Sequence, residues 1–249
     1  MAAYAEFAGF YDQIMGDRTP DIERVRGYIR RYLPSAGSLL ELGCGTGAVL
    51  AGLAAQMPVT GVDLSPQMLA AAARNAPAAR LVRADMTSFA LGTRFDVLIC
   101  VFDTLNHLPS FGAWLDLFDR AHEHLAEGGL FVFDVNTVGR LRRLWQGPAF
   151  AADFGQNTVI MDVTPGGGEL SIWDVRIFEW LHGDQFRLHH ESIPELGVPL
   201  ARIHDALAER FELLEETDLD GGPVSDDSNR VFLAYRHRGG ERHGAQASP

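Results

Sequence analysis

The chain contains no lysine, and all 21 of its basic residues are arginine. Without lysine, no Schiff base to a carbonyl substrate or pyridoxal cofactor can form, and no phosphate-binding P-loop can be completed. Dehydrogenases that rely on a tyrosine–lysine pair are disfavoured for the same reason. The exclusive use of arginine is also typical of a GC-rich bacterial genome.

Cysteine and long apolar runs are scarce as well. Cys44 and Cys100 are the only cysteines, and their wide spacing makes no zinc site, so we interpret them as buried apolar residues and expect no metal. No apolar run approaches the roughly 18 residues of a membrane span, and the first residues do not resemble a secretory signal. We therefore expect a soluble, cytoplasmic protein.

Positive charge is outweighed by negative charge. With 33 acidic against 21 basic residues, the formal net charge is −12. An acidic surface repels phosphate backbones and anionic lipids, so we expect neither nucleic acid nor membrane as a partner. The tight cluster of Arg140, Arg142 and Arg143 is typical of a solvated helix face.

The first 150 residues alternate between short apolar runs and amphipathic segments. This pattern predicts a parallel sheet covered by helices on both faces, that is, an α/β fold. Ser65 and Pro66 provide an N-cap and a first-turn proline for one helix. The predicted strands are 38–42, 59–62, 80–84, 96–102 and 130–135, and the predicted helices are 21–33, 48–56, 66–75 and 111–126, the last ended by Gly128 and Gly129.

The pattern changes after about residue 150. Segments 158–163, 170–181 and 185–192 predict antiparallel strands joined by hairpins, and 198–210 predicts a helix before closing strands at 211–218 and 231–236. We divide the chain into N-terminal cap helices (1–37), a core (38–148 and 197–238), an inserted antiparallel sheet (149–196) and a disordered tail (239–249).

The stretch SLLELGCGTGAVL carries an apolar strand into a glycine turn and then a helix. Gly43, Gly45 and Gly47 permit a sharp turn, and the helix N-terminus behind them favours an anion. The same residues also match G-x-G-x-x-A, a dinucleotide fingerprint. Asp63 ends the next strand, where an acid can bind ribose hydroxyls of either ligand.

The other strand ends add more motifs. LLELGCGTG, VTGVDLSPQML, RADM, FDVLICVFDTLNHL and LAEGGLFVFDVNT, in this order and spacing, resemble the class I S-adenosylmethionine-dependent methyltransferases. Within this superfamily the chain is most similar to small bacterial enzymes with an inserted antiparallel sheet, some of which methylate amines or amino sugars. The resemblance is specific over about residues 38–137 and looser elsewhere. It implies a Rossmann-like, doubly wound seven-stranded sheet whose last strand is antiparallel.

The resemblance also implies roles in binding S-adenosylmethionine and its product, S-adenosylhomocysteine. The methionine end of the cofactor is assigned to Tyr11, Glu41, Gly43, Gly45, Gly47, Val101 and Phe102. Asp63 is assigned to the ribose, and Leu64, Met68, Asp85 and Met86 to the adenine. Each acid by itself is also compatible with a solvated strand end or a helix cap.

Methyl transfer needs alignment, removal of water and, for some acceptors, a base. His107, Asp103 and Asn106 follow the fourth strand and are candidates for this, while Asn136 is a candidate for orienting the acceptor. His107 is equally compatible with a loop histidine bonded to backbone, and Asp103 with a cap.

The inserted sheet carries aromatic residues on both faces. We expect one face to pack on the core and the other to cover the acceptor. The alternative is that both faces are core or a contact between two copies in a homodimer. The candidate pocket residues are Trp173, Phe178, Trp180 and His190. His189 and His190 have no third ligand at a recognisable spacing, so they do not predict a metal site.

The sequence favours a methyltransferase that acts on nitrogen or oxygen of a small molecule. A nicotinamide enzyme is disfavoured by the missing lysine. A protein of the same fold that binds S-adenosylmethionine for regulation or a non-methylating reaction stays an open alternative.

Overall fold

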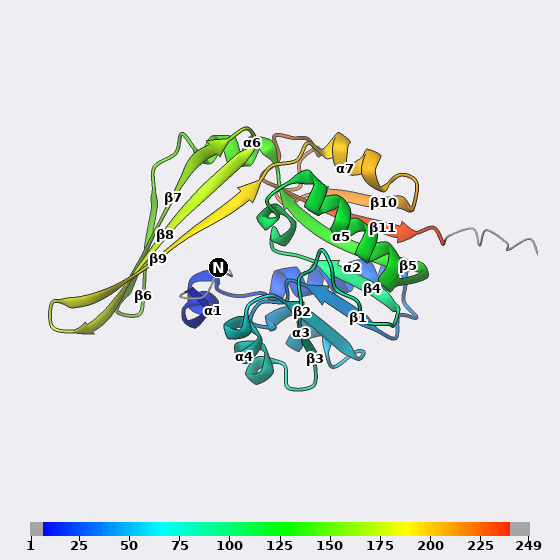
Figure 1. The fold of residues 1–249 in the computed structure, drawn as a ribbon, viewed down its shortest axis with the longest axis horizontal. Helices are drawn as coiled ribbons and strands as arrows, with labels where there is room; N and C mark the ends of the chain where they lie inside the picture. The colour runs from blue at the N-terminus through cyan, green and yellow to red at the C-terminus, as the bar shows by residue number, and fades with distance from the viewer. Residues whose placement is uncertain (1–6, 240–249) are drawn as a thin grey trace, which may run out of the picture.

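The computed structural model describes residues 7–239, which form two sheets (Figure 1). The larger sheet has the strand order β10-β11-β5-β4-β1-β2-β3. Its strands are β1 (Leu39–Leu42), β2 (Val59–Asp63), β3 (Arg80–Arg83), β4 (Phe95–Cys100), β5 (Leu125–Asn136), β10 (Phe211–Asp218) and β11 (Arg230–His237). β1 to β5 pair in parallel, and β11 is antiparallel to both of its neighbours. The predicted Rossmann-like seven-stranded sheet with an antiparallel last strand is confirmed.

Helices cover both faces of this sheet. They are α2 (Thr19–Tyr32), α3 (Ala48–Leu53), α4 (Pro66–Asn75), α5 (Phe111–His124), α6 (Val138–Leu144) and α7 (Leu200–Leu207). α5 and α7 pack on one face through residues such as Trp114 and Ile203, whereas α2 and α3 pack on the other through residues such as Ile29 and Leu50. Each of these side chains is at most 5% exposed, which places them in the two halves of the core.

α4 begins as its sequence predicts. Ser65 has an extended backbone, and its hydroxyl accepts a hydrogen bond from the Met68 N–H at 3.3 Å, with Pro66 at the first helical position. This cap fixes the start of α4 immediately after β2. It therefore also sets where Asp63, Leu64 and Met68 lie relative to the sheet.

The prediction that two glycines end the helix after residue 126 is wrong. α5 ends at His124, and Leu125 is already extended, so that Gly128 and Gly129 lie inside β5. Gly128 has a φ of +73°, and a Cβ on Gly129 would come within 3.0 Å of the Asp96 carbonyl oxygen. The two glycines thus lie where the register between β4 and β5 shifts, between Phe95 and Val97.

The second sheet is antiparallel, with the order β6-β7-β8-β9. Its strands are β6 (Phe150–Phe154), β7 (Asn157–Gly167), β8 (Leu170–His182) and β9 (Gln185–Leu196). The sequence did not predict β6, which is a short edge strand. Figure 1 shows this sheet projecting from one side of the core.

The N-terminal elements η1 (Phe7–Gly9) and α1 (Tyr11–Met15) lie between the second sheet and the core (Figure 1). Phe7 is buried against Val159, Val175, Ile177 and Ile193 of the second sheet. No helix within residues 7–239 combines the length and apolar character needed to cross a membrane. Of the predicted disordered tail, all but Gly239 lies outside the described residues.

Candidate functional site

The glycine turn after β1 depends on backbone conformations that other residues adopt with strain. Gly43, Gly45 and Gly47 have φ values of +66°, +51° and +75°. A Cβ on Gly43 would lie 2.3 Å from Cγ2 of Thr104, whose hydroxyl is held by the Val101 carbonyl at 2.7 Å. The turn therefore needs glycine for both its dihedral angles and its close approach to the next loop.

Asp63 joins the glycine turn to the end of β2. Its Oδ2 accepts a hydrogen bond from the Gly45 N–H at 2.9 Å, and its Oδ1 accepts one from the Ser65 N–H at 2.8 Å. Burial raises the pKa of Asp63, and these backbone donors partly oppose that shift. The carboxylate thus organises two loops from inside the site.

Glu41 is a buried acid with an oxygen that the described residues do not satisfy. It is 3% exposed, and its Oε2 has no hydrogen-bond partner among residues 7–239. Burial, followed by the charge of Asp63, raises the pKa of Glu41 well above its ordinary value. A buried, unsatisfied carboxyl group is costly, so this position fits a ligand that brings a cation or N–H donors.

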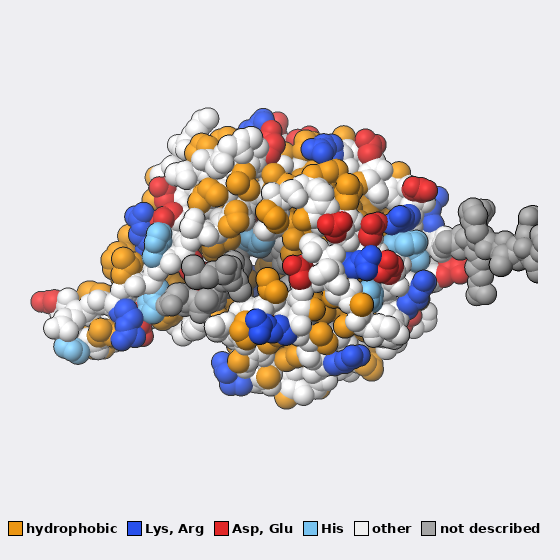
Figure 2. Space-filling view, viewed as in Figure 1, with side chains coloured by type: hydrophobic (Ala, Val, Ile, Leu, Met, Phe, Trp, Pro, Cys, Tyr) orange, Lys and Arg blue, Asp and Glu red, His pale blue; other side chains and the backbone are white. Residues whose placement is uncertain are grey.

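A cavity of about 480 Å³ opens at the carboxyl ends of the parallel strands. Ten of the predicted site residues line it: Tyr11, Gly43, Gly45, Asp63, Leu64, Met68, Asp85, Met86, Phe102 and His107. The second sheet contributes Ile193 and Pro194, which the sequence did not single out. Glu41, Gly47 and Val101 do not line the cavity. Figure 2 shows acidic and basic side chains interspersed around this face of the molecule.

Asp85 lies at the rim of the cavity, where it also closes a local turn. Its Oδ1 accepts hydrogen bonds from the N–H of Thr87 at 2.8 Å and from the Thr87 hydroxyl at 2.7 Å. Asp85 is exposed and no helix follows it, so it matches the solvated strand end that was considered for this acid and not the helix cap. Since a carboxylate has further acceptor positions, this turn also leaves Asp85 able to bind a ligand donor.

Tyr11 brings α1 to the cavity. Burial of its hydroxyl raises the pKa of Tyr11 to about 12, so the phenol stays protonated at neutral pH. Its ring meets Phe7 edge-on with centroids 5.5 Å apart. The guanidinium of Arg18 lies 4.0 Å from the Phe102 ring centroid and 5.7 Å from that of Tyr11, which ties α1 and the loop after β4 together.

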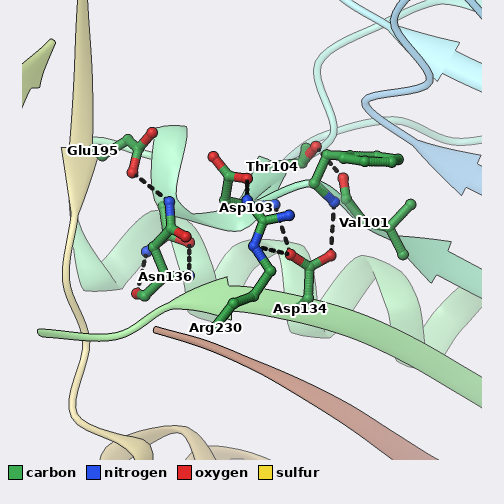
Figure 3. A network of polar contacts seen from close by, with 9 residues as sticks. Val101, Asp103, Thr104, Asp134, Asn136, Glu195 and Arg230 are labelled. Atoms are coloured by element: carbon green, nitrogen blue, oxygen red, sulfur yellow. Dashed lines mark hydrogen bonds and ion pairs between the residues drawn. The ribbon is translucent and has the colours of Figure 1, made fainter. Parts of the chain in front are cut away.

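The loop after β4 contains a strained turn. Phe102 and Asp103 are consecutive non-glycine residues with φ values of +64° and +48°. Such conformations cost on the order of 1–3 kcal/mol each and persist only where the surroundings impose them. Their N–H groups donate to the two carboxylate oxygens of Asp134, at 2.6 and 3.0 Å (Figure 3).

Arg230 of β11 completes this network. It pairs with the Asp103 carboxylate, and its Nε lies 3.4 Å from Oδ2 of Asp134. Burial alone would raise the pKa of Asp103, but Arg230 and His107 bring it below its ordinary value. Asp103 is therefore ionised at neutral pH, and the cap role considered for it is replaced by a buried ion pair.

Asn106 and Asn136 connect the loop to β5 and β9. The Asn106 amide donates to the carbonyl oxygens of Asn136 at 3.0 Å and Leu196 at 2.9 Å, and accepts from the Asn136 N–H at 2.9 Å. The Asn136 amide donates to Oε2 of Glu195 at 2.9 Å. Neither asparagine lines the cavity, so their contacts place them as supports behind it.

His107 ends η2 (Thr104–His107) and lines the cavity. Its Nδ1 lies 3.4 Å from the Pro194 carbonyl oxygen, a long contact in which only the ring can donate. Burial lowers the pKa of His107 despite the nearby Asp103 charge, which favours the neutral ring.

Glu195 is a further acid beside His107 that the sequence did not single out. Ligand atoms of Asp103, His107 and Glu195 lie within 4.8 Å of one another. Burial, then the charge of Asp103, raises the pKa of Glu195 well above its ordinary value. Arg230 already supplies the balancing positive charge to this cluster, so we do not assign it to a metal. One sequence signal could have identified Glu195. It is two residues after Ile193 in β9, and side chains two positions apart in a strand point to the same face.

Three of the four predicted pocket residues of the second sheet lie on its outer face. Trp173 is on the face that packs against Phe7, but Phe178, Trp180 and His190 are on the opposite face. Phe178 pairs with Leu188, Trp180 with Phe186, and His190 with Arg176. None of the four predicted residues lines the cavity. Because neighbouring residues of a strand point to opposite faces, the histidine on the inner face is His189, whose ring centre lies 5.2 Å from that of Phe10.

Comparisons with known proteins agree with this arrangement. Residues 39–129 match a family model described as a methyltransferase domain. A protein of Geobacillus sp. (strain WCH70), provisionally named a methyltransferase, is 30% identical over 94% of this chain and 99% of its own length. The dTDP-3-amino-3,6-dideoxy-alpha-D-glucopyranose N,N-dimethyltransferase of Streptomyces fradiae is 35% identical over 52% of each chain.

Solved structures superpose on most of this chain. The sugar N-methyltransferase KedS8 from Streptoalloteichus sp. superposes with a TM-score of 0.78 at 26% identity, covering 94% of this chain and 93% of its own. Similar structures include methyltransferases with S-adenosylmethionine bound. The unsatisfied Glu41 oxygen and the glycine turn fit the amino-acid end of that ligand.

Proposed function

The chain belongs to the class I S-adenosylmethionine-dependent methyltransferases, and we propose that it transfers the methyl group to the nitrogen of a small amine of the amino-sugar class. The observation that carries the proposal is a neutral histidine in the cavity wall, His107, with two acids, Asp103 and Glu195, close to its ring. Such a site accepts N–H donors and a proton. The sugar amine specificity in the names of the similar proteins supports the same acceptor class.

We propose that the two ends of the cofactor, methionine and adenine, bind the residues that the family resemblance implies. Glu41 and the glycine turn would hold the ammonium and carboxylate of the methionine part, and Tyr11 would donate to that carboxylate. Asp63 would accept from the ribose hydroxyls, and Asp85 from the adenine amino group. The apolar wall of Leu64, Met68 and Met86 would enclose the ring. When bound, the cofactor supplies an activated methyl group on a sulfonium.

The remaining task of the protein is to present an amine with an available lone pair. An amine arrives mainly as an ammonium ion at neutral pH, so it needs a group that takes its proton before attack. We assign the proton of the neutral His107 ring to Nδ1, which lies 3.4 Å from the Pro194 carbonyl oxygen, so that Nε2 would take the proton of the amine. The ionised Asp103 lies close enough to stabilise the imidazolium that forms, and Glu195 lies beside it. Pro194, Ile193 and Phe102 exclude water around this point.

The test is methylation of matched acceptors. Purified protein is incubated with S-adenosylmethionine and either a nucleotide-linked amino sugar or the hydroxy sugar of the same shape, and products are measured by mass spectrometry. We expect methylation of the amine and little of the alcohol. His107→Asn should lower kcat about 100-fold or more while S-adenosylhomocysteine binds as tightly as before.

Two outcomes would contradict the proposal. Methylation of the hydroxy sugar in preference to the amine would reassign the acceptor atom. Tight binding of S-adenosylhomocysteine without turnover of any amine or alcohol would favour the alternative of a regulatory or non-methylating protein.

A further inference from the structure

Asp134 lies fully buried near the end of β5, behind the cavity and not in its wall. Each of its carboxylate oxygens accepts a backbone N–H, from Phe102 at 2.6 Å and Asp103 at 3.0 Å. Figure 3 shows Asp134 below the turn, with Arg230 beside it. A single carboxylate therefore accepts the backbone N–H groups of two consecutive residues that both have left-handed backbone conformations.

The turn that Asp134 holds faces the site on two sides. Phe102 lines the cavity and lies under the guanidinium of Arg18, 4.0 Å from its ring centroid. Asp103 faces His107, with ligand atoms of the two residues within 4.8 Å of each other. A small rotation of this turn would therefore move both the cofactor wall and the acceptor wall.

We propose that Asp134 is a positioning residue that holds the Phe102–Asp103 turn against the cofactor cavity. Only a carboxylate accepts from both N–H groups with equivalent oxygens. An amide at this position would offer one acceptor and would direct its own N–H₂ at the second donor, and a protonated carboxyl group would direct an O–H at it. If either hydrogen bond is lost, Phe102 and Asp103 can leave the left-handed conformation, which the backbone does not favour by itself.

The charge state of Asp134 makes this role visible in solution. Burial raises the pKa of Asp134 to about 6, although Arg230 opposes the shift. The other titratable or charged groups that interact with it are Asp103 in the turn, Cys100 at the end of β4 and Arg140 on α6. Acidification through about pH 6 should therefore protonate Asp134 and loosen the turn while Arg230 and Asp103 stay ionised.

The experiment compares wild type, Asp134→Asn and Asp96→Asn from pH 5 to 8. Asp96 is a matched control, because its carboxylate also accepts from a backbone N–H, that of Gly37 at 2.8 Å, at the opposite end of the sheet. The readouts are the Kd for S-adenosylhomocysteine, by calorimetry, and hydrogen exchange of the peptide spanning 100–106. Neither readout requires the acceptor.

We expect Asp134→Asn to weaken binding about tenfold at pH 7.5, to speed exchange in 100–106, and to lose the part of the wild-type pH dependence centred near pH 6. Asp96→Asn should keep the wild-type pH dependence and exchange. Wild-type affinity in Asp134→Asn, or an unchanged pH dependence, would overturn the proposal. If Asp134→Asn does not fold, wild type at pH 5 and 7.5 provides the same test: after correction for the intrinsic pH dependence of amide exchange, equal protection of 100–106 at both pH values would overturn the proposal.

Discussion

The hydroxyl of Thr46, in the middle of the glycine turn, donates a hydrogen bond of 2.6 Å to Oδ1 of Asp12 on α1. Oδ2 of the same acid accepts from the Asn75 amide at 3.1 Å, and that amide also donates to the Thr46 carbonyl oxygen at 3.0 Å. α1 is thereby attached to the loop that we assign to the methionine end of the cofactor. The residue before Asp12, Tyr11, lines the cavity.

Asp12→Ala should therefore weaken cofactor binding although Asp12 does not line the cavity. Losing these partly exposed hydrogen bonds costs on the order of 1 kcal/mol, or about fivefold in the Kd for S-adenosylhomocysteine. This change in Kd is measured by calorimetry. Asp17→Ala is the control, since Asp17 accepts from the Thr19 N–H at 2.9 Å at the start of α2 and does not contact the glycine turn. Equal effects of the two substitutions would contradict the attachment.

Gly43→Ala should be far more damaging than an alanine at another left-handed glycine. Both Gly43 and Gly92 have positive φ, +66° and +65°, so each alanine carries a similar backbone penalty of about 1 kcal/mol. Only at Gly43 would the new Cβ meet a fixed neighbour, Thr104 at 2.3 Å. We expect at least a tenfold loss of S-adenosylhomocysteine affinity for Gly43→Ala and none for Gly92→Ala, measured together with urea unfolding. Retained affinity in Gly43→Ala would argue against the turn as the cofactor cradle.

Glu41 should couple cofactor binding to proton release. Burial raises its pKa in the free protein, whereas a bound ammonium group favours the ionised carboxylate and lowers that pKa. Binding then expels a proton, so the affinity for S-adenosylhomocysteine should rise as pH rises between the bound and free pKa values of Glu41. Calorimetry in two buffers of different ionisation enthalpy measures this release.

Glu41→Gln tests the same point by substitution. It should bind S-adenosylhomocysteine about tenfold more weakly and release fewer protons. Its free energy of unfolding at pH 7.5 should not fall, because an unsatisfied buried carboxyl group is removed. Glu212→Gln, at an exposed position of β10, should match wild type in both respects. Unchanged proton release in Glu41→Gln would exclude Glu41 as the ammonium partner.

A histidine pair far from the cavity should make stability depend on pH. Nε2 of His237 lies 2.6 Å from Nδ1 of His122, and burial lowers the pKa of both rings. The folded protein then binds fewer protons than the unfolded chain as pH falls below about 6.5, so this pair contributes stability above that pH and loses it on acidification. His122→Asn should reduce the drop in urea midpoint between pH 7.5 and 5.5, whereas His182→Asn, on a hairpin of the second sheet, should not. Identical pH profiles of His122→Asn and wild type would contradict this role.

The sequence predicted the local features at the ends of β1 and β2. The turn at Gly43–Gly47 and the Ser65 cap are local, because each depends on residues a few positions apart and on the strand or helix that adjoins them. Asp63 ends a predicted strand, but its hydrogen bond to the Gly45 N–H joins residues 18 positions apart. Continuous apolar runs likewise predicted the parallel strands, because a strand that is buried on both faces is apolar at nearly every position.

The tertiary structure alone decided how the second sheet and the loop after β4 meet the cavity. Alternation along β8 and β9 divides residues such as Trp173 and Phe178 between two faces, but only packing against Phe7 decides which face is covered. The contacts of Asp103 with Arg230, and of Asn136 with Glu195, join residues 127 and 59 positions apart. Such pairs leave no periodic signal, because a buried polar group can be satisfied by any element that the fold brings beside it.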